Sequence, residues 1–271
     1  MHSRTTHFGS RSFHFHTGHL DNQQSVPSAR RSTALVLPLI VAAASVFSLL
    51  LLLASGLGTR LDIWQFRAGL TLVRFSAYAG LATALLAVLI GVLAIRRRYW
   101  LGIAVSLAAL ICAGVAFGIP YSWKVQAMRY PRIHDITTDV DNPPKFVAVL
   151  PLRKVSADYP GTSVAMQQIK AYPDLKTLIM PEPQDQAFQA ALNAAKDMGW
   201  EIVAAVPEEG RIEAIATTFW FGFKDDVVVR VVPAGNRSLI DVRSTSRVGI
   251  SDLGTNAKRI RAFLAKLQPQ R

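Results

Sequence analysis

The sequence is poor in cysteine, in charged residues and in recognisable catalytic motifs. Cys112 is the one cysteine among 271 residues, which excludes a disulfide framework or a cysteine-based metal site within one chain. Charged residues make up only 18% of the chain, whereas typical soluble proteins carry about 25%. No phosphate-binding loop, dinucleotide fingerprint or G-x-S-x-G serine elbow occurs. The enzyme classes that these motifs mark are therefore disfavoured.

The shortage of charge is concentrated in three long hydrophobic runs. No Asp, Glu, Lys or Arg occurs within residues 34–57, 75–95 or 101–120. About 20 apolar residues cross the hydrocarbon core of a bilayer as a helix, and three such runs would need an unusually large soluble core. The sequence therefore predicts three transmembrane helices at these positions, within a membrane domain of residues 34–123. We expect the lipid bilayer to be a partner. Ionisable residues, which usually mark a transport pathway, are missing from the three runs, so a transporter is a weak alternative.

Arginines beside the hydrophobic runs predict the orientation. Arg30 and Arg31 precede the first run, and residues 96–98 place three arginines in the turn between the second and third runs. Short positively charged flanks stay in the cytoplasm. The soluble domain, residues 124–271, is then predicted on the opposite side of the membrane. Three further arginines within 60–74 argue against this orientation, but less strongly.

The net charge of +12 is unevenly distributed. Residues 1–123 hold 10 Lys and Arg against 2 Asp and Glu, net +8, and residues 124–271 hold 20 against 16, net +4. Most of the excess lies beside the hydrophobic runs, where membrane topology accounts for it. The remainder forms no dense basic stripe, so we expect no nucleic-acid partner.

Residues 1–33 are rich in Ser, Thr, His and Arg, with Asp21 as the only acid. This composition predicts a disordered cytoplasmic tail, and it also resembles an organelle transit peptide. His14, His16 and His19 are spaced to hold a metal ion, but nothing else nearby fixes the geometry of ligands. We therefore predict neither a metal site nor a cofactor.

The soluble part shows the periodicities of an α+β domain. A Pro-rich lead-in at 129–162 contains one candidate strand, 146–150. Short hairpin links between later strands predict an antiparallel sheet in the order β-α-β-β-β-β-α, with both helices covering one face. The predicted elements are a strand at 176–181, a helix at 183–198, strands at 200–206, 211–219, 226–232 and 238–247, and a helix from Ser251 or Asp252 to about 267.

Alternation along these strands predicts which side chains lie on the uncovered face of the sheet. Most are charged: Glu213, Asp226, Arg230, Asp241, Arg243 and Arg247. One interpretation is a solvated face with cross-strand charge pairs. The other is a site for an anionic ligand or partner, since arginine binds carboxylate and phosphate through a planar fork. The candidate ligand-binding residues are Arg230, Asp241, Arg243 and Arg247.

A catalytic set is only weakly indicated. His134, the one histidine of the soluble part, neighbours Asp135 and Asp139, and a His–Asp pair is able to act as general acid and base. No serine or cysteine is placed beside them in a known nucleophile motif. Whether the protein is an enzyme is left open, with the balance against it.

Three long strings carry a family resemblance. RIHDITTDVDNPPKFV (132–147), TTFWFGFKDDVVVRV (217–231) and DVRSTSRVGISDLGTNAKRIRAFL (241–264) resemble the bacterial family called domain of unknown function 1499. The resemblance covers about 130–268, and the three spans resemble the membrane-anchored proteobacterial members. It implies a multi-pass protein of the bacterial inner membrane with a periplasmic domain, and it supplies no reaction.

Two functions are therefore expected from different classes. The first is a non-catalytic module of the cell envelope that binds an anionic small molecule or an envelope protein. The alternative is a periplasmic hydrolase that uses His134 with a nearby carboxylate.

Overall fold

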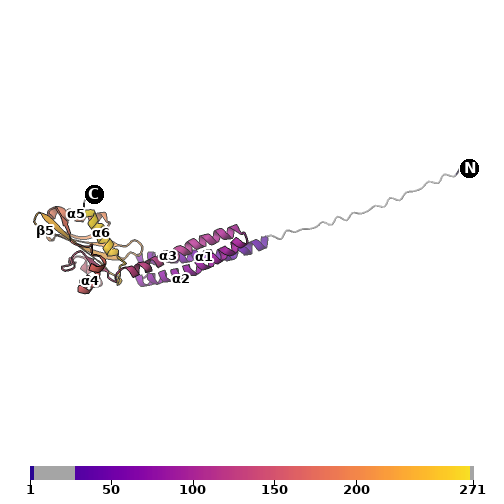
Figure 1. The fold of residues 1–271 in the computed structure, drawn as a ribbon, viewed down its shortest axis with the longest axis horizontal. Coiled ribbons are helices and arrows are strands. Elements are labelled where there is room, and N and C mark those ends of the chain that lie inside the picture. The colour runs from indigo at the N-terminus through magenta and orange to yellow at the C-terminus, as the bar shows by residue number, and fades with distance from the viewer. Residues whose placement is uncertain (3–27, 269–271) are drawn as a thin grey trace.

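The computed structural model describes residues 1, 2 and 28–268. Three long helices lie side by side, and a mixed α/β domain sits at one end of them (Figure 1). By length and composition, each helix is able to cross a membrane. The three predicted helices are present, but each extends beyond the predicted span, and the third continues to Arg129. The helices are α1 (Ser28–Arg60), α2 (Phe66–Arg96) and α3 (Trp100–Arg129).

Small residues fill the contacts between the three helices. Ala113 and Ala116 of α3 are fully buried. A Cβ added to Gly80 of α2 would lie 3.0 Å from the backbone oxygen of Ala113, so the two backbones approach closely. Large apolar side chains such as Leu85 and Ile111 point outward and are exposed. Small residues inside and large apolar residues outside are what helices packed within lipid require.

The domain contains an antiparallel sheet, as predicted, but with six strands where the sequence predicted five. Its order is β1-β6-β5-β4-β3, and β2 pairs with β6 beside β1. The residue pairs Glu213–Val228 and Arg230–Asp241 lie opposite each other on neighbouring strands. The strands are β1 (Asp135–Thr137), β2 (Leu178–Met180), β3 (Glu201–Val206), β4 (Arg211–Thr217), β5 (Lys224–Ala234) and β6 (Arg237–Ser246).

Two helices, α5 (Gln184–Asp197) and α6 (Thr255–Leu267), cover one face of the sheet. Phe188 of α5 and Phe263 of α6 are buried in the core beneath them. The predicted alternation is confirmed, because Val227, Val229 and Val231 of β5 all join this core. The last helix begins three residues later than predicted: Gly254 adopts a left-handed conformation just before Thr255.

The sequence did not predict helix α4 (Thr162–Ala171) or strand β1. Gln168 of α4 joins them. Its Oε1 accepts the backbone N–H of Thr137 at 2.9 Å, and its Nε2 donates to the backbone oxygen of Thr137 at 2.6 Å. A buried glutamine thus provides hydrogen-bond partners for the backbone N–H and C=O at the edge of β1, a strand only three residues long. Both elements are therefore fixed by tertiary contacts and not by a local periodicity.

The prediction that the second face of the sheet is uncovered is wrong. Residues 139–160, including the short 3₁₀ helix η1 (Leu150–Leu152), fold back over it. Phe146 and Val149 of this segment pack on Ile215 and Val228 of the sheet. The predicted strand at 146–150 is also wrong, because the prolines and a buried carboxylate bend this stretch into turns. We call residues 139–160 the cover segment.

The β4–β5 loop, residues 218–223, joins the domain to the helices. Phe221 packs with Leu52 and Val73, and the ring centroids of Trp220 and Trp123 lie 5.2 Å apart. A Cβ on Gly56 of α1 would lie 1.8 Å from Trp220 Cδ1, so only glycine leaves room for this ring. Arg60 donates to the backbone oxygens of Thr218 and Phe219. Aromatic packing therefore seats the domain directly on the helix ends.

Candidate functional site

A network of ion pairs joins the sheet to the cover segment. We call it the ion-pair belt. All four of the predicted ligand-binding residues belong to it, and most of its members are buried or half-buried. Its charges balance, because five arginines face five carboxylates. The pairs are Arg243–Asp135, Arg153–Asp226, Arg247–Asp226, Arg211–Glu213, Arg230–Asp139 and Arg230–Asp241.

Glu213 of β4 holds the middle of the cover segment. Its side chain is fully buried. Its two oxygens accept backbone N–H groups from Val147 at 3.0 and 3.1 Å, Ala148 at 2.9 Å and Val149 at 3.0 Å. Arg211, two residues earlier on the same strand, supplies the counter-charge. One carboxylate thus replaces the backbone pairing that a strand at this position would have had.

Arg243 of β6 lies beneath the cover segment with its side chain 3% exposed. Its Nε and Nη2 donate to Asp135 at 2.9 and 2.7 Å, and further N–H groups donate to the backbone oxygens of Pro144 and Ala157. The rings of Phe146 and Tyr159 lie 5.0 and 5.4 Å from its guanidinium carbon. Since a guanidinium has five N–H groups, Arg243 keeps a single donor for any ligand.

The other predicted ligand residues are also engaged within the chain. Arg230 donates to Asp139 at 2.8 Å and to Asp241 at 2.7 Å. Asp241 further accepts the hydroxyls of Thr138 at 3.0 Å and Thr177 at 2.6 Å. Arg247 binds Asp226 through its Nε and Nη2 and donates to the backbone oxygen of Leu152. These groups therefore connect strands and cover segment, and a ligand role for them stays a prediction.

A hollow of about 450 Å³ opens above Arg243. Tyr159 lines it, and the hydroxyl of Tyr159 is buried and has no hydrogen-bond partner among the described residues. Burial, and next the charge of Asp135, raise the pKa of Tyr159 to about 12. The hydroxyl therefore stays protonated at neutral pH and is able to donate a hydrogen bond. The exposed Lys145 lines this hollow and a neighbouring one of about 270 Å³ beside Arg230. We call the larger hollow the Arg243 hollow.

The predicted acid–base residues His134 and Asp135 line one hollow, but both predicted carboxylates are bound elsewhere. Asp135 is bound by Arg243, and Asp139 by Arg230 and by the backbone N–H groups of Asp141 and Asn142. His134 lines a separate hollow of about 250 Å³, and its Nδ1 is buried with no hydrogen-bond partner in the described part of the chain. His134 thus has neither Asp135 nor Asp139 as a hydrogen-bond partner. Its role in catalysis stays a prediction.

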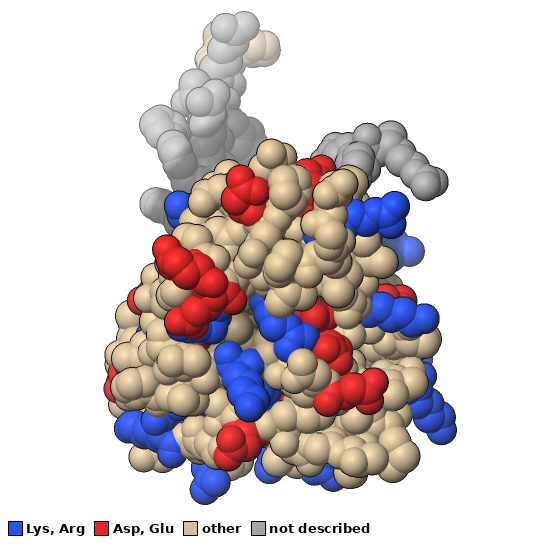
Figure 2. Space-filling model, turned by 90° about the vertical axis from the view of Figure 1, so that its left-hand side faces the viewer, with Lys and Arg blue, Asp and Glu red and all other residues tan. Residues whose placement is uncertain are grey.

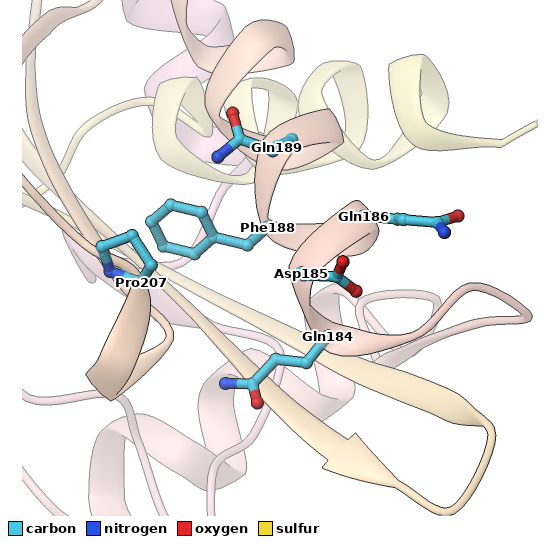
Figure 3. Close-up of a pocket in the computed structure, with 6 residues that line it drawn as sticks. All are labelled: Gln184, Asp185, Gln186, Phe188, Gln189 and Pro207. Carbon is cyan, nitrogen blue, oxygen red and sulfur yellow. The ribbon is translucent and has the colours of Figure 1, made fainter.

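Another hollow, of about 610 Å³, lies between the start of α5 and Pro207. Figure 3 shows the ring of Phe188 directed at Pro207 while Asp185 and Gln186 point elsewhere. Gln184 donates to the backbone oxygen of Val231 at 3.2 Å. The lining brings no two charged side chains together, so this hollow is a weaker candidate than the one above Arg243.

The surface of the domain that faces away from the helices carries charges of both signs, interspersed (Figure 2). Within residues 28–268, no three His, Cys, Asp or Glu side chains are grouped to hold a metal ion. His14, His16 and His19 lie outside the described residues. The charge pattern on this surface resembles that of an ordinary soluble domain.

The sequence predicted Arg243 as a site residue but did not predict Lys145 and Tyr159, which line the hollow above it. Lys145 and Tyr159 belong to the Pro-rich stretch, where no periodicity indicates a direction for any side chain. The only available signal was the concentration of turn-forming residues between 139 and 160, which is also typical of a simple linker.

The comparisons with known proteins identify one family. Residues 135–267 match the model of the family described as "Protein of unknown function (DUF1499)". The match covers the sheet, its two covering helices and the cover segment. No curated protein and no solved structure matches the chain.

Proposed function

We propose, from the premise that residues 135–267 belong to the DUF1499 family, that this protein is a membrane-anchored binding module without catalytic activity. The observation that carries the proposal is the Arg243 hollow, which is lined by Lys145 and by Tyr159, whose buried hydroxyl has no partner within the described part of the chain. An unpaired buried donor is costly to leave unsatisfied. A ligand oxygen in the hollow would satisfy it.

The lining indicates the chemistry of the ligand. Tyr159, Lys145 and the remaining N–H of Arg243 are all donors, so they favour a carboxylate or a single phosphate group. Asp141 and Asp158 line the same hollow and would repel a polyanion. We therefore propose a small ligand with one anionic group and with hydroxyl or amine groups elsewhere, such as a sugar acid or an amino acid.

A ligand screen on the detergent-solubilised full chain tests this proposal. Thermal-shift measurements with sugar acids and amino acids should identify a binder whose affinity falls about tenfold in Tyr159→Phe and in Lys145→Gln, since each loses one hydrogen bond to a charged group. Lys154→Gln is the matched control, because Lys154 is exposed and does not line the hollow. Binding that is equal in all three variants, or no binder at all, would refute the proposed site.

We also propose that the protein is a multi-pass protein of the bacterial inner membrane with its N-terminus in the cytoplasm. The three apolar helices support the membrane placement. The three arginines at 96–98 support the orientation, because they lie in the turn between α2 and α3, at the end of the helices away from the domain, and positive flanks stay in the cytoplasm. The domain, which sits at the opposite end of the helices, would then be periplasmic.

Cysteine labelling tests this orientation directly. Cys112 is the one native cysteine and lies half-buried in α3. Asp158→Cys in the cover segment should react with a membrane-impermeant maleimide in cells with a permeabilised outer membrane, whereas Arg97→Cys should react only after the cells are lysed. The reverse pattern would place the domain in the cytoplasm.

The hydrolase alternative has less support. It depends on His134, whose neighbour Asp135 is already bound by Arg243. The observation in its favour is the buried Nδ1 of His134, which has no hydrogen-bond partner among the residues that the structure describes. We retain it as the second hypothesis.

A further inference from the structure

A second hollow lies where the domain meets the helices. Its volume is about 260 Å³. One wall is apolar and is formed by Phe66 and Leu70 of α2 with Phe223 of the β4–β5 loop. The domain supplies the rest of the lining, which mixes apolar residues such as Val248 and Leu253 with the carboxylates of Asp225 and Asp252. We call it the junction hollow. Neither the ion-pair belt nor the Arg243 hollow contributes a residue to it.

The position of Leu70 along α2 places this hollow at headgroup depth. The arginines at 96–98 must lie outside the hydrocarbon, so the apolar part of α2 is counted back from Ile95. At 1.5 Å per residue, a core of about 30 Å ends near Ser76. Leu70 and Phe66 therefore lie roughly 9–15 Å beyond the hydrocarbon edge. That level is the outer edge of the headgroup layer, which extends about 5–8 Å from the hydrocarbon, and the water just above it.

Positive charge flanks the apolar wall on α2. Arg67 and Arg74 are exposed, and they lie three residues before and four residues after Leu70, on the same side of the helix. The guanidinium carbon of Arg67 lies 6.0 Å from the ring centroid of Phe66, which lines the hollow. Among the described residues, no carboxylate lies within ion-pair distance of either arginine. Neither arginine lines the hollow itself, but both guanidinium groups are exposed beside it and are available to an anion such as a lipid phosphate.

Negative charge lies on the domain side. Asp225 is buried and paired with Arg259 at 2.6 Å, so its charge is already balanced. Asp252 accepts the backbone N–H groups of Gly254 at 2.9 Å and Asn256 at 2.6 Å and has no cationic partner among the described residues. Burial, opposed by these hydrogen bonds and assisted by the charge of Asp225, raises the pKa of Asp252. A cation in the hollow would offset this cost of burying the carboxylate.

We propose that the junction hollow binds a zwitterionic phospholipid with a primary ammonium headgroup, of the phosphatidylethanolamine class. Arg67 and Arg74 bind the phosphate, Asp252 accepts the ammonium N–H groups, and the acyl chains follow the exposed apolar side of α2 past Phe75. A trimethylated ammonium has no N–H to donate, and an anionic headgroup would face Asp252. The inference rests on the proposed membrane placement and is independent of the ligand proposed for the Arg243 hollow.

Native mass spectrometry of the full chain tests the proposal. The detergent-solubilised protein is mixed with equal amounts of ethanolamine, choline and glycerol phospholipids that share the same acyl chains. We expect the ethanolamine lipid to be retained about tenfold over the choline lipid, as for one hydrogen bond to a charged group. Asp252→Asn keeps an acceptor for the start of α6 but removes the charge, and should abolish the preference. Asp197→Asn, at the exposed end of α5, is the matched control and should retain it.

A second variant is needed because Asp252→Asn could lose the lipid preference by disturbing the start of α6. Leu70→Trp fills the hollow from the helix side without altering any charge, and it should also abolish the preference. Equal retention of the three lipids by the unmodified protein, or an unchanged preference in either variant, would overturn the proposal. Displacement of the lipid by an equal concentration of soluble phosphoethanolamine would overturn the assignment to a lipid. Retention of no lipid of any kind would also overturn the proposal, whereas the proposed orientation in the membrane is tested separately by the cysteine labelling.

Discussion

Replacing Glu213 with glutamine should lower the free energy of unfolding by about 3–5 kcal/mol, because it removes one partner of a buried ion pair. The side chain is fully buried, and its two oxygens accept N–H groups from Val147, Ala148 and Val149. Glutamine offers one oxygen and one NH₂ group, so an N–H donor would face other N–H donors. Arg211 would also lose its main counter-charge. Thermal unfolding of the full chain in detergent, followed by circular dichroism, measures the loss.

Glu209→Gln is the matched control for this substitution. Glu209 lies just before β4, in the β3–β4 connection, and also binds Arg211, at 2.8 Å, but its side chain is 58% exposed. A solvent-exposed pair contributes about 0–1 kcal/mol. The two substitutions make the same chemical change, so the difference between them reports the burial of Glu213 together with its hydrogen bonds to the cover segment. Equal destabilisation by both would show that Glu213 does not hold the cover segment in place.

Arg243→Met should destabilise the domain by a similar amount, about 3–5 kcal/mol. The substitution leaves Asp135, with its side chain 4% exposed, as a buried charge without a cation. It also removes the donors to Pro144 and Ala157, which attach both ends of the cover segment to β6. The thermal midpoint should fall, and protease cleavage within residues 139–160 should become faster. An unchanged midpoint would contradict this assignment.

A double-mutant cycle separates the charge from the packing. Adding Asp135→Asn to Arg243→Met removes the stranded carboxylate, so the double variant should be more stable than Arg243→Met alone. Arg261→Met is the control, because Arg261 and Asp174 form a pair with side chains 40% and 52% exposed. It should cost less than about 1 kcal/mol. Loss of ligand binding in an Arg243 variant would thus not identify a site by itself, which is why the ligand experiment uses Tyr159 and Lys145.

The sequence was most informative where local physics dominates. Three uncharged runs longer than a bilayer core allowed no other interpretation than long apolar helices, and all three are present. Alternation on β4 and β5 correctly separated Ile212 and Val227, which join the core, from Glu213 and Asp226, which face the cover segment. Gly199 at a positive φ ends α5 where predicted. In each case a residue's own shape or the period of its element decides the outcome.

The sequence was least informative where distant segments meet. The charged face was correctly predicted and wrongly described as uncovered, because no local pattern shows that Val147 and Val149 return to a carboxylate more than 60 residues away. Local patterns also do not show that the ring of Tyr159 packs against Arg243. Nor do they show that Phe66 lines a hollow, because that hollow forms only where the domain contacts the helices.

The sequence by itself therefore determined the three apolar helices, the antiparallel sheet and the list of charged residues on its second face, since these follow from hydrophobicity and from the period of each element. Only the tertiary structure decided what those charges do. A buried carboxylate and a buried guanidinium must find partners wherever the chain can bring them, and here the partners come from a Pro-rich segment without periodicity of its own. The Arg243 hollow and the junction hollow, which are proposed to bind a ligand and a lipid, are likewise lined by residues that are far apart in the sequence.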